Sequence, residues 1–126
     1  MSKLIMTINV TTYEAQVLDG QASRVVMIPF SAIASGEYFA GKTVAKGVDT
    51  QITTKNGFYL SARYMLEGTD FSGKKCRLFI ENNGTSLENC KPEIHTDSDE
   101  LAFLENAELT ANAECMENGA LIKIYN

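Results

Sequence analysis

Short turn signals recur along this chain at fairly even intervals, and they constrain its fold more than any other feature. Asn-Gly and Asp-Gly dipeptides accept positive φ and favour the type I′ turn, whose twist matches that of two flanking antiparallel strands. A Ser-Gly dipeptide adds a further tight turn. The turn signals are Asp19-Gly20, Asn56-Gly57, Ser72-Gly73, Asn83-Gly84 and Asn118-Gly119. Each of them marks an expected hairpin.

The segments between the turns are rich in Val, Ile, Thr, Tyr and Phe, and long amphipathic helical patterns are missing. Strands at this spacing are typical of an antiparallel meander, sandwich or barrel rather than of βαβ units. The sequence therefore predicts an all-β protein, an antiparallel β-barrel of about ten strands in a single domain over residues 1–126. The expected strands are 3–10, 12–18, 22–30, 38–44, 48–54, 58–67, 75–82, 92–96, 108–116 and 120–125.

One segment departs from the strand pattern. The run from Asp97 to Glu100 offers a cap residue with a carboxylate three places on, and apolar residues follow it. That arrangement is a capping-box start to a helix. We expect one short helix of about two turns near residues 98–105, which covers an open end of the barrel.

Composition and charge restrict the partners. The chain has 16 acidic residues against 11 Lys and Arg, a net charge of −5, and its longest basic run is Lys74-Lys75. Nucleic-acid binding needs clustered cations, so nucleic acid is not an expected partner. No apolar stretch is long enough for a transmembrane helix or a signal-peptide core, which predicts a cytoplasmic protein without a membrane partner. The cysteines form neither a CxxC pair nor a disulfide framework.

The hairpin over residues 58–82 is the most informative part of the chain. Because successive side chains of a strand alternate between its faces, one face is apolar and the other mixes charged and aromatic residues. The mixed face holds Tyr59, Ser61, Arg63, Met65, Glu67, Lys75, Arg77, Phe79 and Glu81. Two orientations are open: the mixed face lies in water, with cross-strand ion pairs such as Glu67 with Lys75, or it lines a barrel lumen that holds a ligand.

The lumen orientation defines a candidate site. Asp49 alternates with apolar residues in the neighbouring expected strand, and it would approach Arg63 or Glu67 there. An Arg among carboxylates in a semi-enclosed space can hold a polar ligand group and can shift a carboxyl pKa. The candidate ligand-binding residues are Arg63, Asp49, Glu67, Glu81, Tyr59 and Phe79, and the candidate catalytic residues are Asp49, Glu67 and Glu81. Structural ion pairs across a hairpin are the alternative explanation of the same residues.

Other residues carry weaker signals. His95 is the single histidine, and a zinc site would usually need more imidazoles or thiolates, so we expect a solvated His95 and no metal or cofactor. Cys76 alternates onto an apolar face and is expected in the core, whereas Cys90 precedes Lys91-Pro92 and is expected in a loop. Asp70 is expected to form an Asx turn.

Several segments in order resemble a known bacterial family. They are RVVMIPF (24–30), GEYFAGKTVAKGVDTQ (36–51), ARYMLEGTD (62–70), FIENNG (79–84) and NGALIKIY (118–125). The family is the uncharacterised domain of unknown function numbered three-two-three-seven, and the resemblance covers about residues 20–125. It implies a calycin-like or lipocalin-like barrel and supplies no reaction. The positions that fall on its motifs are Gly47, Asp49, Arg63, Tyr64, Glu67, Glu81, Asn82 and Gly84.

Three functions remain open at this point. The first is a binding module that holds a small, partly polar metabolite in the lumen, with Arg63 gripping an anionic or carbonyl group. The second is a cofactor-independent isomerase, cyclase or lyase in which a lumen carboxylate transfers a proton. The third is a structural interaction protein that assembles into a homo-oligomer.

Overall fold

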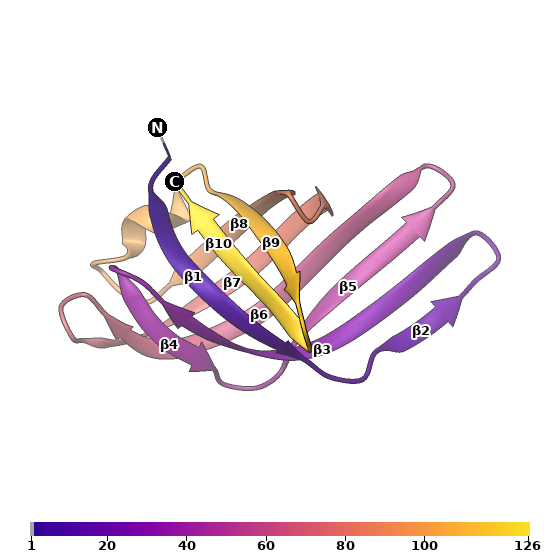
Figure 1. Cartoon of the computed structure of the whole chain (residues 1–126). Helices are drawn as coiled ribbons and strands as arrows, with labels where there is room; N and C mark the ends of the chain where they lie inside the picture. The colour runs from indigo at the N-terminus through magenta and orange to yellow at the C-terminus, as the bar shows by residue number, and fades with distance from the viewer. Residues whose placement is uncertain (1) are drawn as a thin grey trace.

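The computed structural model describes residues 2–126 and is an antiparallel barrel of eight strands with two additional strands, as the sequence predicts (Figure 1). The strands in chain order are β1 (Leu4–Thr12), β2 (Gln16–Asp19), β3 (Ser23–Ser35), β4 (Phe39–Thr43), β5 (Gly47–Thr54), β6 (Gly57–Asp70), β7 (Lys75–Ser86), β8 (Asn89–Thr96), β9 (Thr110–Met116) and β10 (Gly119–Tyr125). Among residues 2–126 we find no helix that is both long and apolar enough to cross a membrane.

The barrel closes because β1 pairs with both β10 and β3. The long strands β3 and β6 each change partners along their length: their first halves pair with β5, and their second halves pair with β4. The β2–β3 and β5–β6 hairpins therefore reach beyond the end of β10, as Figure 1 shows on its right-hand side. This end of the barrel is flared, and the opposite end carries the helical turn.

The apolar face of the 58–82 hairpin points into the barrel. Leu66, Leu78 and Ile80 are fully buried, and Ile8 and Ile124 meet them from β1 and β10. Each such side chain contributes about 1.5–3 kcal/mol when it leaves water. The alternation in β6 and β7 thus fixes the interior of the barrel, and the mixed face of the same strands lies outside.

The expected helix is shorter than predicted. A single 3₁₀ turn, η1 (Ala102–Glu105), replaces the two-turn helix over 98–105. The expected cap does not start this turn, because its N-cap is Leu101, without a side-chain cap hydrogen bond; Ser98 Oγ accepts the Leu101 amide at 3.2 Å just before the turn. Leu101 and Leu104 are buried against the barrel, and the Glu105 carboxylate accepts the Thr96 amide at 3.0 Å. These tertiary contacts bend the segment back onto β8 before a second helical turn forms.

One of the predicted turns is wrong. β7 continues through Asn83-Gly84 to Ser86, and the hairpin turn follows at residues 87–88. Gly84 instead allows β7 to pack closely against β8, because a Cβ at this position would lie 2.7 Å from both the Asn89 carbonyl oxygen and Cys90 Sγ. By contrast, Asn118 does adopt a positive φ of 64° in the β9–β10 turn.

Asp70 ties the two ends of its turn together, and it forms the expected Asx turn. Its Oδ1 accepts the Ser72 hydroxyl at 2.6 Å, the Ser72 amide at 2.9 Å and the Lys74 amide at 3.2 Å. Its Oδ2 accepts the Ser98 hydroxyl at 2.9 Å, which joins the turn to the segment before η1. These bonds, the Ser72 hydroxyl first, lower the pKa of the Asp70 carboxyl below 3.8.

Asp70→Asn is expected to lower the melting temperature at pH 7. A carboxyl whose pKa is lower in the folded state stabilises the protein above its unfolded pKa, and this contribution is lost as the pH falls through the folded pKa. The difference in Tm between wild type and variant should therefore be largest at neutral pH and shrink below about pH 4. Thermal unfolding from pH 2.5 to 7 measures it, with the exposed Asp99→Asn as control; a difference independent of pH contradicts the assignment.

Candidate functional site

Most of the sequence-predicted site residues lie on the outer surface of the sheet. The Arg63 side chain is 66% exposed and that of Glu67 is 56% exposed. Tyr59 is half exposed, while Phe79 is half-buried on the same face, with its ring 6.0 Å from that of the exposed His95. The interpretation in which this mixed face lines the lumen is therefore wrong, because the alternate face of β6 and β7 fills the barrel. A ligand contact by these residues on the outer surface stays a prediction.

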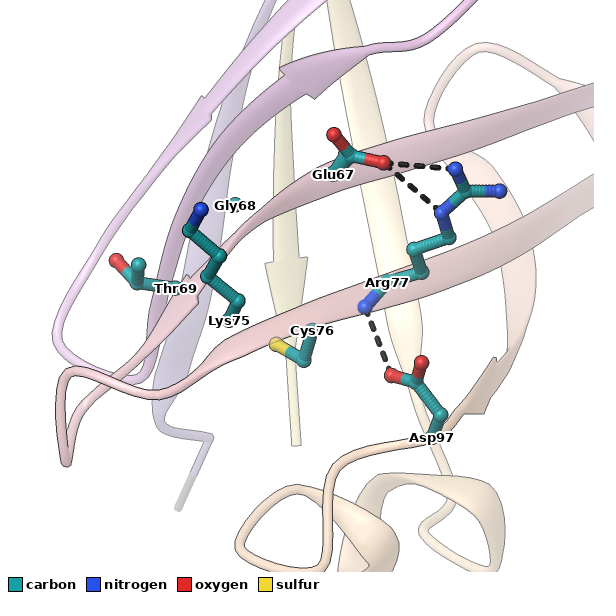
Figure 2. A pocket seen from close by; sticks show the side chains of 7 residues that line it. All are labelled: Glu67, Gly68, Thr69, Lys75, Cys76, Arg77 and Asp97. Atoms are coloured by element: carbon teal, nitrogen blue, oxygen red, sulfur yellow. Dashed lines mark hydrogen bonds and ion pairs between the residues drawn. The ribbon is translucent and has the colours of Figure 1, made fainter.

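The charged residues of the outer face form cross-strand ion pairs. Arg63 Nε lies 2.8 Å from Glu81 Oε1, and Arg77 Nη2 lies 2.8 Å from Glu67 Oε2. Figure 2 shows the second pair in a shallow surface groove, where Asp97 also accepts the backbone amide of Arg77. The partner of Glu67 is Arg77 rather than the expected Lys75, because the register places Glu67 opposite Arg77. Exposed pairs of this kind are worth about 0–1 kcal/mol.

Asp49 is the one predicted site residue that faces the lumen. In the β5–β6 ladder Val48 lies opposite Arg63 and Asp49 lies opposite Ala62, so Asp49 shares the inward face with Ala62. It therefore does not approach Arg63 or Glu67, and the expected network of one Arg with several carboxylates does not form. The strand β5 turns its polar side, with Asp49 and Gln51, into the barrel.

A row of inward side chains crosses four strand pairs at the level of Asp49. Ile28 of β3, Asp49, Ala62 of β6, Asn82 of β7 and Pro92 of β8 are successive partners in the ladders. Ala62 has the smallest side chain of this row, so it leaves a hollow between Asp49 and Asn82. A cavity of about 80 Å³ occupies this part of the lumen. Its walls are Val10, Thr12, Ile28, Phe30, Asp49, Leu60, Ala62, Asn82, Leu87, Cys90, Ala113, Ala120 and Ile122.

Two acceptor oxygens in this cavity region lack partners. Asp49 Oδ2 accepts Gln51 Nε2 at 2.9 Å, but Asp49 Oδ1 is buried and accepts no hydrogen bond from residues 2–126. The same holds for Asn82 Oδ1, on a side chain that is 4% exposed. Buried polar groups are normally hydrogen-bonded, and an unpaired one costs about 1–3 kcal/mol. Burial also raises the pKa of the Asp49 carboxyl above 3.8.

Cys90 adds a thiol to the cavity wall. It lies in β8 and is 2% exposed, so the expectation of a loop cysteine is wrong: β8 begins at Asn89, earlier than predicted. Its Sγ donates to the Ser86 carbonyl at 3.2 Å, and burial raises the pKa of the thiol. Cys76 is buried in the core as predicted.

Asn82 is the functional candidate that the sequence interpretation left out of the site. Its signal was present in the alternation, because Cys76, Leu78 and Ile80 precede it at two-residue spacing on the apolar face. A polar residue in phase with a buried face must find a partner or face a polar cavity. Among residues 2–126 there is no group of three His, Cys, Asp or Glu side chains placed to hold a metal ion.

Comparison with known proteins supports the fold. No protein-family model and no curated protein matches the chain. A protein of unknown function from Clostridium acetobutylicum ATCC 824 is similar in structure, with 24% identity, a TM-score of 0.83, and 99% of this chain and 95% of that chain covered. A β-barrel-like protein from Acinetobacter baumannii AYE follows at 16% identity and a TM-score of 0.75, with the same shares covered. An enzyme from Penicillium herquei has 14% identity and a TM-score of 0.73, covering 100% and 94%. These similarities establish an antiparallel β-barrel fold.

Proposed function

We propose that this protein binds a small, mostly apolar ligand in the barrel lumen, with Asp49 and Asn82 as its polar contacts. The observation that carries the proposal is the pair of unpartnered acceptor oxygens beside one cavity. Binding sites are commonly concave and mostly apolar with a few converging polar groups, and the lining of this cavity has that composition.

The cavity limits the size of the ligand. At about 80 Å³ it is smaller than the 300–1,000 Å³ pockets that take drug-sized molecules, so it suits a molecule of a few carbon atoms. Leu87 of the β7–β8 turn lines the cavity and is 37% exposed. We therefore place the entrance at this turn, at the flared end of the barrel.

The proposal includes membership of the uncharacterised family that the sequence resembles, and a calycin-like character of the barrel. Support comes from a neighbour of unknown function and a β-barrel-like neighbour with the same fold, and from the position of the motif residues. Asp49 and Asn82 line the cavity, and Tyr64 faces the interior beside Phe30, with ring centroids 5.1 Å apart. The outward motif residues, Arg63 and Glu81 among them, form ion pairs instead.

Filling the hollow tests the binding proposal. Isobutanol, a small apolar probe with one polar group, is expected to shift the amide NMR signals around Asp49 and Asn82 in the wild type. Ala62→Leu places a larger side chain between these two residues and is expected to abolish the shifts. Ala113→Leu fills the cavity from β9 and serves as a second blocking variant if the first folds poorly.

The matched control is Arg63→Ala, one residue along the same strand but on the outer face. Loss of the exposed Arg63–Glu81 pair should leave isobutanol binding unchanged. Equal binding by wild type and by both folded blocking variants rules out the lumen site. Loss of binding in Arg63→Ala would instead restore the outer face as the ligand site.

A second candidate function is a cofactor-independent enzyme in which Asp49 transfers a proton. Two observations favour it: a carboxyl whose pKa is raised by burial faces the cavity, and a neighbour with this fold is an enzyme. A general acid or base works best when its pKa approaches the working pH. Deuterium exchange into a small ketone, cyclobutanone, tests this function: the wild type should accelerate it and Asp49→Asn should not.

A further inference from the structure

The two unpartnered atoms on residues that line the cavity are both acceptors, whereas the unpartnered Tyr64 hydroxyl lies in the interior on a residue outside the cavity wall. Asp49 Oδ1 and Asn82 Oδ1 have no donor among residues 2–126, while Gln51 already satisfies the other Asp49 oxygen. A ligand that completes this site must therefore donate hydrogen bonds.

The charge of the lumen points the same way. No Lys, Arg or His is among the residues that line the cavity, and Asp49 and Cys90 are its titratable groups. Arg24, Arg63 and Arg77 are paired with Asp19, Glu81 and Glu67 on exposed parts of the sheet. A buried carboxylate without a cationic partner is costly, and a cation within hydrogen-bond reach offsets part of that cost. An anionic ligand would add a like charge.

The two acceptor residues lie on either side of Ala62. Asp49 and Asn82 are separated by one strand, which at about 4.8 Å per strand puts their backbones roughly 10 Å apart. Ala62 lies between them in the ladders and all three residues line the cavity, so a small group over Ala62 has an acceptor residue on either side. The remaining wall, with Val10, Leu60 and Ile122, offers only apolar contact to the rest of the ligand.

We propose that the lumen ligand is a short aliphatic primary amine, bound as the ammonium with its nitrogen between Asp49 Oδ1 and Asn82 Oδ1. This inference rests on the proposed lumen function and names its ligand class. An ammonium group has three donors and no acceptor. It can donate to both unpartnered oxygens and it neutralises the one carboxylate of the cavity. An alcohol can donate a hydrogen bond but carries no charge, so it leaves the carboxylate unneutralised.

Isobutylammonium and isobutanol share one carbon skeleton and separate the inference from the proposed function. By NMR titration at pH 7 the wild type is expected to bind the ammonium at least tenfold more tightly. With Asp49→Asn the two probes should bind about equally tightly, because the substitution removes the charge of the side chain and keeps its shape. Glu81→Gln, on the outer face, should leave the preference unchanged. In the wild type the ammonium affinity should fall in acid as Asp49 becomes protonated, at a pH above the ordinary carboxyl pKa.

Each outcome decides one of the two ideas. Isobutanol that binds as tightly as isobutylammonium, with both blocked by Ala62→Leu, overturns the amine inference and leaves the lumen site standing. Absence of lumen binding by both probes overturns the site itself. A tenfold preference that persists in Asp49→Asn also overturns the inference, since the charge would then come from elsewhere.

Discussion

A leucine in place of Asp49 is expected to raise the free energy of unfolding by about 1–3 kcal/mol at pH 7. The carboxylate lies among apolar cavity residues with one oxygen unpartnered. Its hydrogen bonds therefore offset only part of the free-energy cost of removing it from water. Leucine removes that penalty and projects into the existing cavity, with little need for the wall to move. The same variant should lose binding of isobutylammonium. Urea unfolding and NMR titration of one sample measure both effects.

The stabilisation should depend on pH with a definite sign. Because burial raises the folded pKa of Asp49, the folded state binds more protons than the unfolded state between about pH 4 and the raised value, and the wild type loses stability as the pH rises through this window. The gain from Asp49→Leu should therefore be largest at neutral pH and smaller in acid. Glu81→Leu removes an ion pair on the outer face and should change stability by about 1 kcal/mol or less. A variant less stable than wild type at pH 7 would show that Asp49 is satisfied in the free protein.

Gly68→Ala is expected to destabilise the protein by about 2–4 kcal/mol. Gly68 lies opposite Gly41 where β6 exchanges β5 for β4. A Cβ there would overlap the Ala40 carbonyl oxygen and stand 2.5 Å from Gly41 Cα. These are backbone atoms, so the contact is relieved only by moving β4 away from β6. Urea unfolding followed by circular dichroism measures the loss.

Gly73→Ala provides the comparison for that variant. Gly73 has a φ of +84° but no atom within 4 Å of an added Cβ, so its substitution reports backbone strain without a steric clash. A cost of about 1 kcal/mol is expected there. A cost for Gly68→Ala no greater than for Gly73→Ala would mean that β4 and β6 are free to separate.

The barrel was predictable because its signals are local. Turn dipeptides and β-branched runs placed strands in all ten observed segments, and the alternation in residues 58–82 identified the apolar face that fills the interior. The errors lie where distant segments meet. Leu104 and Glu105 contact the barrel and limit the predicted helix to one 3₁₀ turn. Position 84 requires a glycine because of close packing against Cys90, not because of a turn.

The candidate site was predictable only in part. Asp49 was found because a carboxylate alternates with apolar residues in a strand, and it does face the lumen. Arg63, Glu67, Glu81, Tyr59 and Phe79 were grouped with it on the assumption that their face is enclosed, and the structure places them outside. Asn82 was named only as a motif position and not as a site residue, although it continues the apolar alternation of β7.

Local sequence is enough to predict that the chain forms antiparallel strands and which side chains of a strand share a face, because the two-residue period of a strand is a property of the backbone. Which face is enclosed was decided by the tertiary structure. In β5 the polar residues Asp49 and Gln51 point inward and the apolar Val48 and Ile52 point outward, since the ladder fixes Asp49 opposite Ala62. Register across neighbouring strands, which no single strand encodes, brings Asp49 and Asn82 to one cavity.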